Sequence, residues 1–207
     1  MTAPGGPLSE RVVVLAPRGR DAQIAGEILR EADLPVRISP DLAGLCADKG
    51  VHVCLMHMLG EPRTMQDDPH YDDVVDDIKA FLEERLRYAV AEGIAEDRVW
   101  LDPGIGFGKT VDHNLALLGR LDELAAIGRP IVVGTSRKGF IGRISGEEIE
   151  GRVPGTIATN VIALGNGAEV FRVHDVAAVA QALDVAAATF RGQWNGATTT
   201  STTSTTT

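Results

Sequence analysis

The chain has 207 residues, a formal net charge of −9, 44% hydrophobic residues and 24% charged residues. These values fit one globular domain of ~100–200 residues or part of a larger one, and they exclude a wholly disordered chain. The acidic excess, with only 4% aromatic residues, argues against a nucleic-acid-binding surface. Two cysteines make no disulfide framework, and no stretch approaches the ~20 apolar residues of a membrane span, so we expect a cytoplasmic protein.

Short apolar runs alternate with amphipathic segments along the chain. Strands are predicted at 12–16, 36–38, 51–56, 99–101, 130–134 and 169–173. Helices are predicted at 21–32, 41–47, 72–91, 112–126, 156–164 and 175–190. This alternation is typical of parallel strands with right-handed crossovers, and strands apolar on both faces indicate a sheet covered by helices. A doubly wound sheet and a (β/α)-barrel both fit, although the units are too few for a barrel of eight.

The apolar spacing also predicts which side chains are buried. In the helix 72–91 the apolar stripe runs from Val75 to Val90, and in the helix 112–126 Leu115 begins a row of inner leucines. Cys54 lies inside a predicted strand and is expected to be a buried, unreactive thiol. The chain ends in a run of Thr and Ser only, so residues 193–207 are expected to form a disordered tail.

Polar side chains follow four of the predicted strands. They lie at Met56 to Met58, Asp102, Ser136 to Lys138 and Arg172 to Asp175. In parallel α/β folds the carboxyl ends of the strands carry the functional site. Among these residues, the carboxylate of Asp102 would then meet two arginines, a lysine and His174 at one edge. This predicts a cationic pocket for a substrate with phosphate or carboxylate groups.

Each of these residues also has a plainer interpretation. Asp102 before Pro103 is compatible with a turn cap, although a carboxylate directly after a buried strand is costly. The glycine-rich loop 104–109 lacks the spacing of a Walker loop and, taken alone, indicates a flexible turn. His174 alone fits a core histidine, but Arg172 shares its strand face, and the two together favour an anion clamp.

Four strings in the chain resemble dihydropteroate synthase, a folate-pathway enzyme with a (β/α)8 barrel. They are VCLMHMLGEPRTMQDDPHYDDVV, LDPGIGFGKTVDHNLALLGRL, IVVGTSRKGFIGRI and GTIATNVIALGNGAEVFRVHDV, in the family's order. They correspond to the last four strand–helix units of the family. The resemblance implies an α/β fold that is an incomplete (β/α)8 barrel, of the TIM-barrel type. Residues 41–192 would form the pterin-binding half-barrel, and residues 1–40 an unrelated N-terminal β–α–β segment.

The family joins a pterin that carries a CH2-diphosphate to p-aminobenzoate and releases pyrophosphate, with Mg2+ accompanying the diphosphate. The resemblance implies that Asp102 and Lys138 bind the pterin ring and that Arg172 and His174 hold the diphosphate. Lys138, Arg172 and His174 are the implied catalytic residues. The implied substrate-binding residues are Met58 and Phe107 as pocket wall, Ser136 and Arg137 on the p-aminobenzoate side, and Asp102, Lys138, Arg172 and His174.

The chain also departs from the family pattern. It lacks the Asn-Val-Thr-Pro-Asp-Ser-Phe and Ser-Thr-Arg-Pro loops of the N-terminal half, and Gly139 stands where the family often has a serine near the aminobenzoate carboxylate. One hypothesis is therefore an active dihydropteroate synthase, commonly a dimer through its later helices. The alternative is a truncated, non-catalytic remnant or dimerising fragment. A related pterin-binding methyltransferase is disfavoured by the intact Ser-Arg-Lys and Arg-Val-His strings.

Overall fold

The strands of the chain are parallel, as predicted. The computed structural model describes residues 12–14, 36–38, 52–60 and 64–193. The strands β1 (Val12–Val14) and β2 (Val36–Ile38) pair with each other. A four-stranded sheet has the order β3 (Val53–Met56), β4 (Val99–Asp102), β5 (Ile131–Val133) and β6 (Ala168–Phe171). The predicted helices at 21–32 and 41–47 and the predicted tail lie outside the described residues, apart from residue 193.

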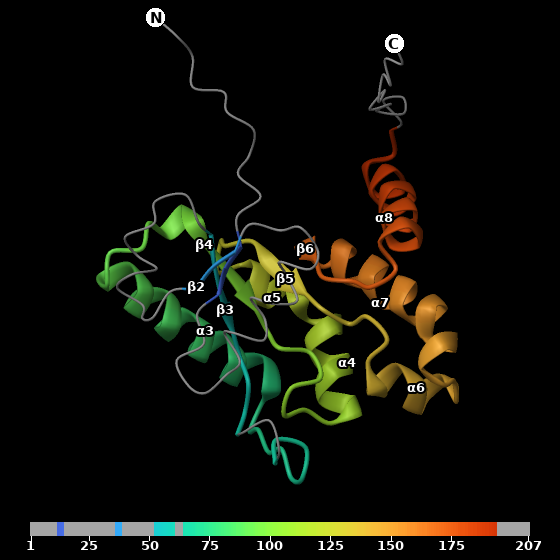
Figure 1. Cartoon of the computed structure of the whole chain (residues 1–207), viewed down its shortest axis with the longest axis horizontal. Helices are drawn as coiled ribbons and strands as arrows, with labels where there is room; N and C mark the ends of the chain where they lie inside the picture. The colour runs from blue at the N-terminus through green and yellow to red at the C-terminus, as the bar shows by residue number, and fades with distance from the viewer. Residues whose placement is uncertain (1–11, 15–35, 39–51, 61–63, 194–207) are drawn as a thin grey trace, which may run out of the picture.

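Helices connect each strand of the four-stranded sheet to the next. They are α3 (Val74–Ala91), α4 (Val111–Gly119), α5 (Leu121–Ala125), α6 (Gly139–Ser145) and α7 (Val153–Gly165), with short 3-10 turns at Glu96–Arg98 and Ile149–Arg152. A last helix, α8 (Val176–Arg191), follows β6. Figure 1 shows the sheet in the middle of the view, with α3 on one side and α7 and α8 on the other. No helix among the described residues is long and apolar enough to cross a membrane.

The predicted helix 112–126 is two helices, α4 and α5. The helix is interrupted at Arg120, because its φ of −117° and ψ of 28° lie outside the helical region. Its guanidinium binds the carboxylates of Glu123 at 2.7 Å and Asp73 at 2.8 Å. Asp73 in turn caps α3 by accepting from the backbone N–H groups of Val75 and Asp76. The break therefore ties the α4–α5 junction to the start of α3.

The core lies between one face of the sheet and the helices. Val53, Leu101 and Ile131 of neighbouring strands belong to one buried cluster with Ile78 and Leu82 of α3. Successive strand residues point to opposite faces. On the other face of β3, Cys54 is exposed and Met56 is 37% exposed. The prediction of a buried Cys54 is wrong, because no described residue buries this face at β3.

Two helical side chains expected to be buried are exposed. Val90 is 39% exposed, because each i, i+4 step overshoots a full turn by ~40° and the stripe rotates away from the core. The neighbouring Ala89, which is 2% exposed, faces the core at this turn of the helix instead. Leu115 is 45% exposed, because a strict i, i+3 row slips back by ~60° a step and cannot stay on one helix face.

These exposures predict different effects of truncation within α3. Leu82→Ala removes a side chain that is 0% exposed, so we expect a loss of about 2–5 kcal/mol in the free energy of unfolding. Val90→Ala, the matched control on the same helix, is expected to cost at most about 0.5 kcal/mol. Urea unfolding followed by circular dichroism measures both. Equal losses would contradict the assignment of the buried face.

Candidate active site

The sequence-predicted site residues meet at the carboxyl edge of the four-stranded sheet. Asp102 ends β4, and the segments after β3, β5 and β6 begin at the same edge because the strands are parallel and adjacent. The backbone N–H of His57 donates to the carbonyl of Asp102 at 3.0 Å, and that of Arg172 donates to Val133 at 3.0 Å. The ladder of backbone bonds therefore extends into the site itself. Met58 lies half-buried in the segment after β3.

The centre of the site is an ion pair between Asp102 and Arg172. The Asp102 side chain is 1% exposed, and its Oδ2 accepts from the Arg172 guanidinium at 2.9 Å. Its Oδ1 accepts from the backbone N–H of Gly104 at 2.7 Å. Both carboxylate oxygens are therefore compensated, as a buried charge requires. The Arg172 side chain is 56% exposed and is open to solvent on its other side.

Gly134, the residue directly after β5, leaves room for the Arg172 guanidinium beside the Asp102 carboxylate. A Cβ added at Gly134 would lie 3.0 Å from Nη2 and 3.3 Å from Nε of Arg172. These separations are shorter than ordinary van der Waals contact. A side chain at position 134 would therefore press on the guanidinium, which would have to shift by a few tenths of an ångström.

The segments after β5 and β6 are joined by two further polar contacts. Ser136 Oγ lies 2.8 Å from His174 Nδ1 and also accepts from the His174 backbone N–H at 3.1 Å. The guanidinium of Arg137 makes a bidentate pair with Asp175, at 2.6 and 2.9 Å. The exposed His174 therefore pairs with Ser136 and not with Arg172. The prediction that Arg172 and His174 share a strand face is wrong, because β6 ends at Phe171, before both residues.

Arg137 adopts a left-handed backbone conformation that its neighbours hold in place. Its φ is +54°, which is uncommon for a residue with a side chain. Its N–H donates to Thr156 Oγ1 at 3.0 Å, and its carbonyl accepts from Arg152 at 3.1 Å. The Arg152 guanidinium passes over Gly142, where a Cβ would lie 2.5 Å from its nitrogen atoms. This conformation turns the chain so that Ser136 and Lys138 flank the site.

The glycine-rich loop after β4 is held at many points, which differs from the flexible turn expected from its sequence alone. The N–H of Gly106 donates to Asn114 Oδ1 at 2.7 Å, and its carbonyl accepts from Gln66 at 2.7 Å. Tyr71 donates to the carbonyl of Gly108 at 2.8 Å. Gly104 has a φ of +68°, and a Cβ there would overlap the carbonyl oxygen of His57. The loop thus packs directly on the segment after β3.

Lys138 crosses from the segment after β5 to this loop. Its ammonium donates to the carbonyl of Ile105 and lies 4.2 Å from the centre of the Phe107 ring, a cation–π contact. Burial lowers the pKa of Lys138 to about 8, although the negative charge of Asp102 opposes the shift. Phe107 itself is half-buried, as expected for a pocket wall.

Lys109 and His57 form a buried pair, and the sequence analysis assigned a role to neither of them. Lys109 is 3% exposed, and its ammonium lies 3.1 Å from His57 Nδ1 and 2.9 Å from the carbonyl of Phe107. Burial lowers the pKa of Lys109 to about 7 and that of His57 to about 4. A neutral histidine accepts a hydrogen bond from the ammonium, so the pair joins the segments after β3 and β4. The only signal in the sequence was a lysine directly after the glycines.

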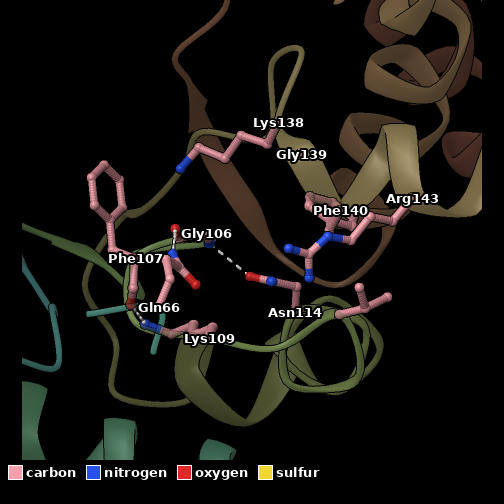
Figure 2. Close-up of a pocket in the computed structure, with 10 residues that line it drawn as sticks. Gln66, Gly106, Phe107, Lys109, Asn114, Lys138, Gly139, Phe140 and Arg143 are labelled. Carbon is pink, nitrogen blue, oxygen red and sulfur yellow. Dashed lines mark hydrogen bonds between the residues drawn. The ribbon is translucent and has the colours of Figure 1, made fainter. Parts of the chain in front are cut away.

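A pocket of about 350 Å³ lies beside Lys138 and Phe107. Figure 2 shows it between the glycine-rich loop, the start of α4 and the helix α6. Asn114 lines it from α4, and Gly139 and Arg143 line it from α6. An apolar ring, amide groups and cations thus surround a space large enough for a small aromatic molecule.

The fold and the position of the site define an α/β protein of the (β/α)-barrel type. Residues 33–174 match the family described as pterin binding enzyme. The chain is 45% identical over 137 residues to dihydropteroate synthase of Haemophilus influenzae, covering 66% of this chain and 50% of that protein. It is 39% identical over 178 residues to dihydropteroate synthase of Escherichia coli, covering 82% of this chain and 63% of that protein.

Solved structures of high similarity carry the same name. Dihydropteroate synthase of Yersinia pestis, in a sulfonamide complex, superimposes with a TM-score of 0.74 at 36% identity, covering 86% of this chain and 66% of that one. The Thermus thermophilus dihydropteroate synthase in complex with 4-aminobenzoate superimposes with a TM-score of 0.71 at 40% identity, covering 87% of this chain and 74% of that one. The chain belongs to the pterin binding enzyme family, and the predicted resemblance and barrel-type fold are confirmed. It spans 50% and 63% of the length of the two curated relatives named above.

The close packing of Gly104 on His57 predicts a steric effect of substitution. Gly104→Ala should cost more stability than Gly128→Ala, because both positions have a positive φ but only Gly104 lies against a carbonyl oxygen. The control should lose about 1–2 kcal/mol to left-handed strain alone. Urea unfolding of the two variants compares them. A loss for Gly104→Ala that does not exceed the control's would contradict the observed loop packing.

The buried Lys109 predicts a pH-dependent stability. Its pKa falls from 10.5 to about 7 on folding, so between these values the unfolded chain binds a proton that the folded chain does not. The free energy of unfolding should therefore rise with pH over this window, by up to a few kcal/mol. Lys109→Met should flatten the rise between pH 7 and 9.5, and Lys79→Met should keep it. Equal slopes in wild type and Lys109→Met would contradict the lowered pKa of Lys109.

Proposed function

We propose that the chain is a dihydropteroate synthase, which condenses 6-hydroxymethyl-dihydropterin diphosphate with p-aminobenzoate and releases pyrophosphate. Similar solved structures are dihydropteroate synthases in complex with 4-aminobenzoate, 6HMPPP and 7,8-dihydropteroate. The observation in this chain that supports the proposal most directly is the buried carboxylate of Asp102. It lies at the carboxyl edge of a barrel-type sheet, paired with an arginine that is open to solvent.

Asp102 is suited to bind the pterin ring. A pterin presents several N–H donors along one edge, and a carboxylate accepts two of them side by side. In this role the ring takes the Oδ2 position that Arg172 occupies here. Lys138, held over Phe107, adds donors to ring acceptors from the adjacent side.

Arg172 and His174 are suited to hold the diphosphate. The Arg172 side chain is 56% exposed, so other side chains do not enclose its guanidinium. The guanidinium can therefore turn from Asp102 toward an anion. Guanidinium groups bind phosphate oxygens with two parallel hydrogen bonds. His174 lies in the same segment and is exposed beside Ser136.

The reaction exchanges one bond to the pterin methylene carbon for another. The C–O bond breaks and its electron pair leaves with pyrophosphate, while the pterin ring delocalises the positive charge on carbon. The amine nitrogen of p-aminobenzoate then forms the C–N bond and releases one proton. Arg172 and His174 stabilise the charge that develops on the leaving group. An aromatic amine is a sufficient nucleophile, so no strong general base is required.

Mg2+ remains a prediction of the resemblance. Among the described residues no group of three His, Cys, Asp or Glu side chains could hold a metal ion. Mg2+ is commonly bound through substrate phosphates with few protein ligands. We therefore expect the cation to accompany the diphosphate, and the roles given above use only side chains of the chain.

The pocket beside Lys138 and Phe107 is suited to p-aminobenzoate. Its volume of about 350 Å³ fits a single aromatic ring, and the Phe107 side chain offers an apolar surface for it. Ser136 and Arg137 were predicted on this side. Their side chains bind His174 and Asp175, so we propose that they position the segment after β5.

The competing hypothesis is a non-catalytic remnant. A coupled assay for pyrophosphate release, with pterin diphosphate, p-aminobenzoate and Mg2+, separates the two. A synthase gives turnover that requires both substrates. A folded chain that binds pterin diphosphate without turnover would support the remnant instead.

Substitutions at the site predict unequal losses of activity. Lys138→Ala and Arg172→Ala should each lower kcat/KM by about 100-fold or more, because each removes a charge from the reacting region. Gly139→Ser should change it little, because a Cβ at Gly139 meets no atom within 4 Å. Initial rates of pyrophosphate release measure all three. Equal, small effects would argue against the proposed site.

A cytoplasmic location remains a prediction from the composition, and a homodimer remains a prediction of the resemblance. Exposed apolar side chains lie on the last two helices, at Ile162 of α7 and at Val176, Val185 and Phe190 of α8. We propose this surface as the dimer contact, since later helices serve that purpose in the family.

A further inference from the structure

Among the described residues that line the pocket beside Phe107, one cation has no bonding partner. Lys109, Lys138 and Arg143 all line it. The ammonium of Lys109 is used by His57 and Phe107, and that of Lys138 by the carbonyl of Ile105. Among the residues that the structure describes, the guanidinium of Arg143 has no hydrogen-bond or ion-pair partner.

The uncharged polar side chains of this pocket are already engaged. Asn114 accepts from Gly106 at 2.7 Å and donates to the carbonyl of Thr110 at 2.6 Å. Gln66 donates to the carbonyl of Gly106 at 2.7 Å. Each amide then keeps one N–H, which is a weaker donor to an anion than a guanidinium is. Among the described lining residues, Arg143 is therefore the charged group that is free to bind an anion.

The geometry of α6 directs Arg143 over the pocket. Gly139 and Arg143 lie four residues apart, on one face of the helix, and long helical side chains lean toward the N-terminus. Because Gly139 has no side chain and a Cβ there would meet only open space, nothing on the helix obstructs the guanidinium. Figure 2 shows it pointing from α6 into the pocket.

We propose that Arg143 binds the carboxylate of the aminobenzoate substrate and thereby selects a benzoate over a neutral aniline. This inference rests on the proposed function and assigns a specificity-determining residue to it. A guanidinium binds a carboxylate through two parallel hydrogen bonds. With the carboxylate on Arg143, the ring packs beside Phe107 and the amine is directed away from α6, toward Lys138 and the sheet edge.

The test compares p-aminobenzoate with 4-aminobenzamide, which has the same ring and amine but no charge. Calorimetric titrations use the full chain with pyrophosphate and Mg2+ present. Wild type should bind the acid more tightly than the amide, by roughly 10- to 100-fold for a charge-assisted pair. Arg143→Met should weaken acid binding until the ratio is near one and leave amide binding unchanged. Arg143→Lys should keep part of the preference.

Two controls separate this role from a structural one. Arg87→Met removes an exposed arginine of α3 and should leave the acid-to-amide ratio unchanged. Binding of pterin diphosphate, titrated separately, should be the same in wild type and Arg143→Met. If Arg143→Met keeps the wild-type ratio while pterin diphosphate still binds, this inference is wrong and the proposed function stands. If wild type binds neither pterin diphosphate nor p-aminobenzoate, both are wrong.

Discussion

A carboxylate that is 1% exposed at the end of a parallel strand has to be compensated by donors that stay in place. Asp102 obtains one from the backbone of Gly104 and one from Arg172. The first requires the tight turn after β4, and the second passes close to Gly134, the residue directly after β5. The conformations of the segments after β4, β5 and β6 thus all depend on one buried charge. Removing Arg172 would leave that buried charge without its ionic partner, which typically costs several kcal/mol.

Steric constraints then fix the segments against one another. Gly104 and Gly108 of the loop after β4 lie under the carbonyl oxygens of His57 and Leu59, and a Cβ at Gly108 would come within 2.6 Å of the latter. Polar groups inside this contact have to be satisfied as well, and Lys109 does so by bonding His57 and the loop carbonyl of Phe107. The same arrangement that rigidifies the loop also holds a lysine in a place that lowers its pKa. Stability and the shape of the pocket therefore have a common origin.

Most of the strands and the set of residues at the site follow from local patterns. Buried strands need apolar β-branched runs, and parallel topology brings the residues after them together, so Asp102, Ser136 and Arg172 could be placed at one edge. Side-chain partners could not be predicted, because they depend on where β6 ends and on the turn at Arg137, whose φ of +54° is set by distant contacts. The exposure of Val90 and Leu115 depended on helical phase over several turns. The exposure of Cys54 could not be predicted, because it depends on what covers the second face of the sheet and not on the residues around Cys54 in the sequence.

The pairing of Asp102 with Arg172 also constrains how a pterin can bind. Neutral ring N–H groups stabilise a buried carboxylate less than a guanidinium does, because a charged donor forms the stronger hydrogen bond. Replacing Arg172 on Oδ2 by a ring therefore loses electrostatic energy unless the positive charge stays close by. The diphosphate of the proposed substrate meets this condition, since it holds Arg172 near the ring that has displaced it. On this reasoning a pterin without the diphosphate binds weakly, because the interaction that it breaks is not replaced by one of equal strength.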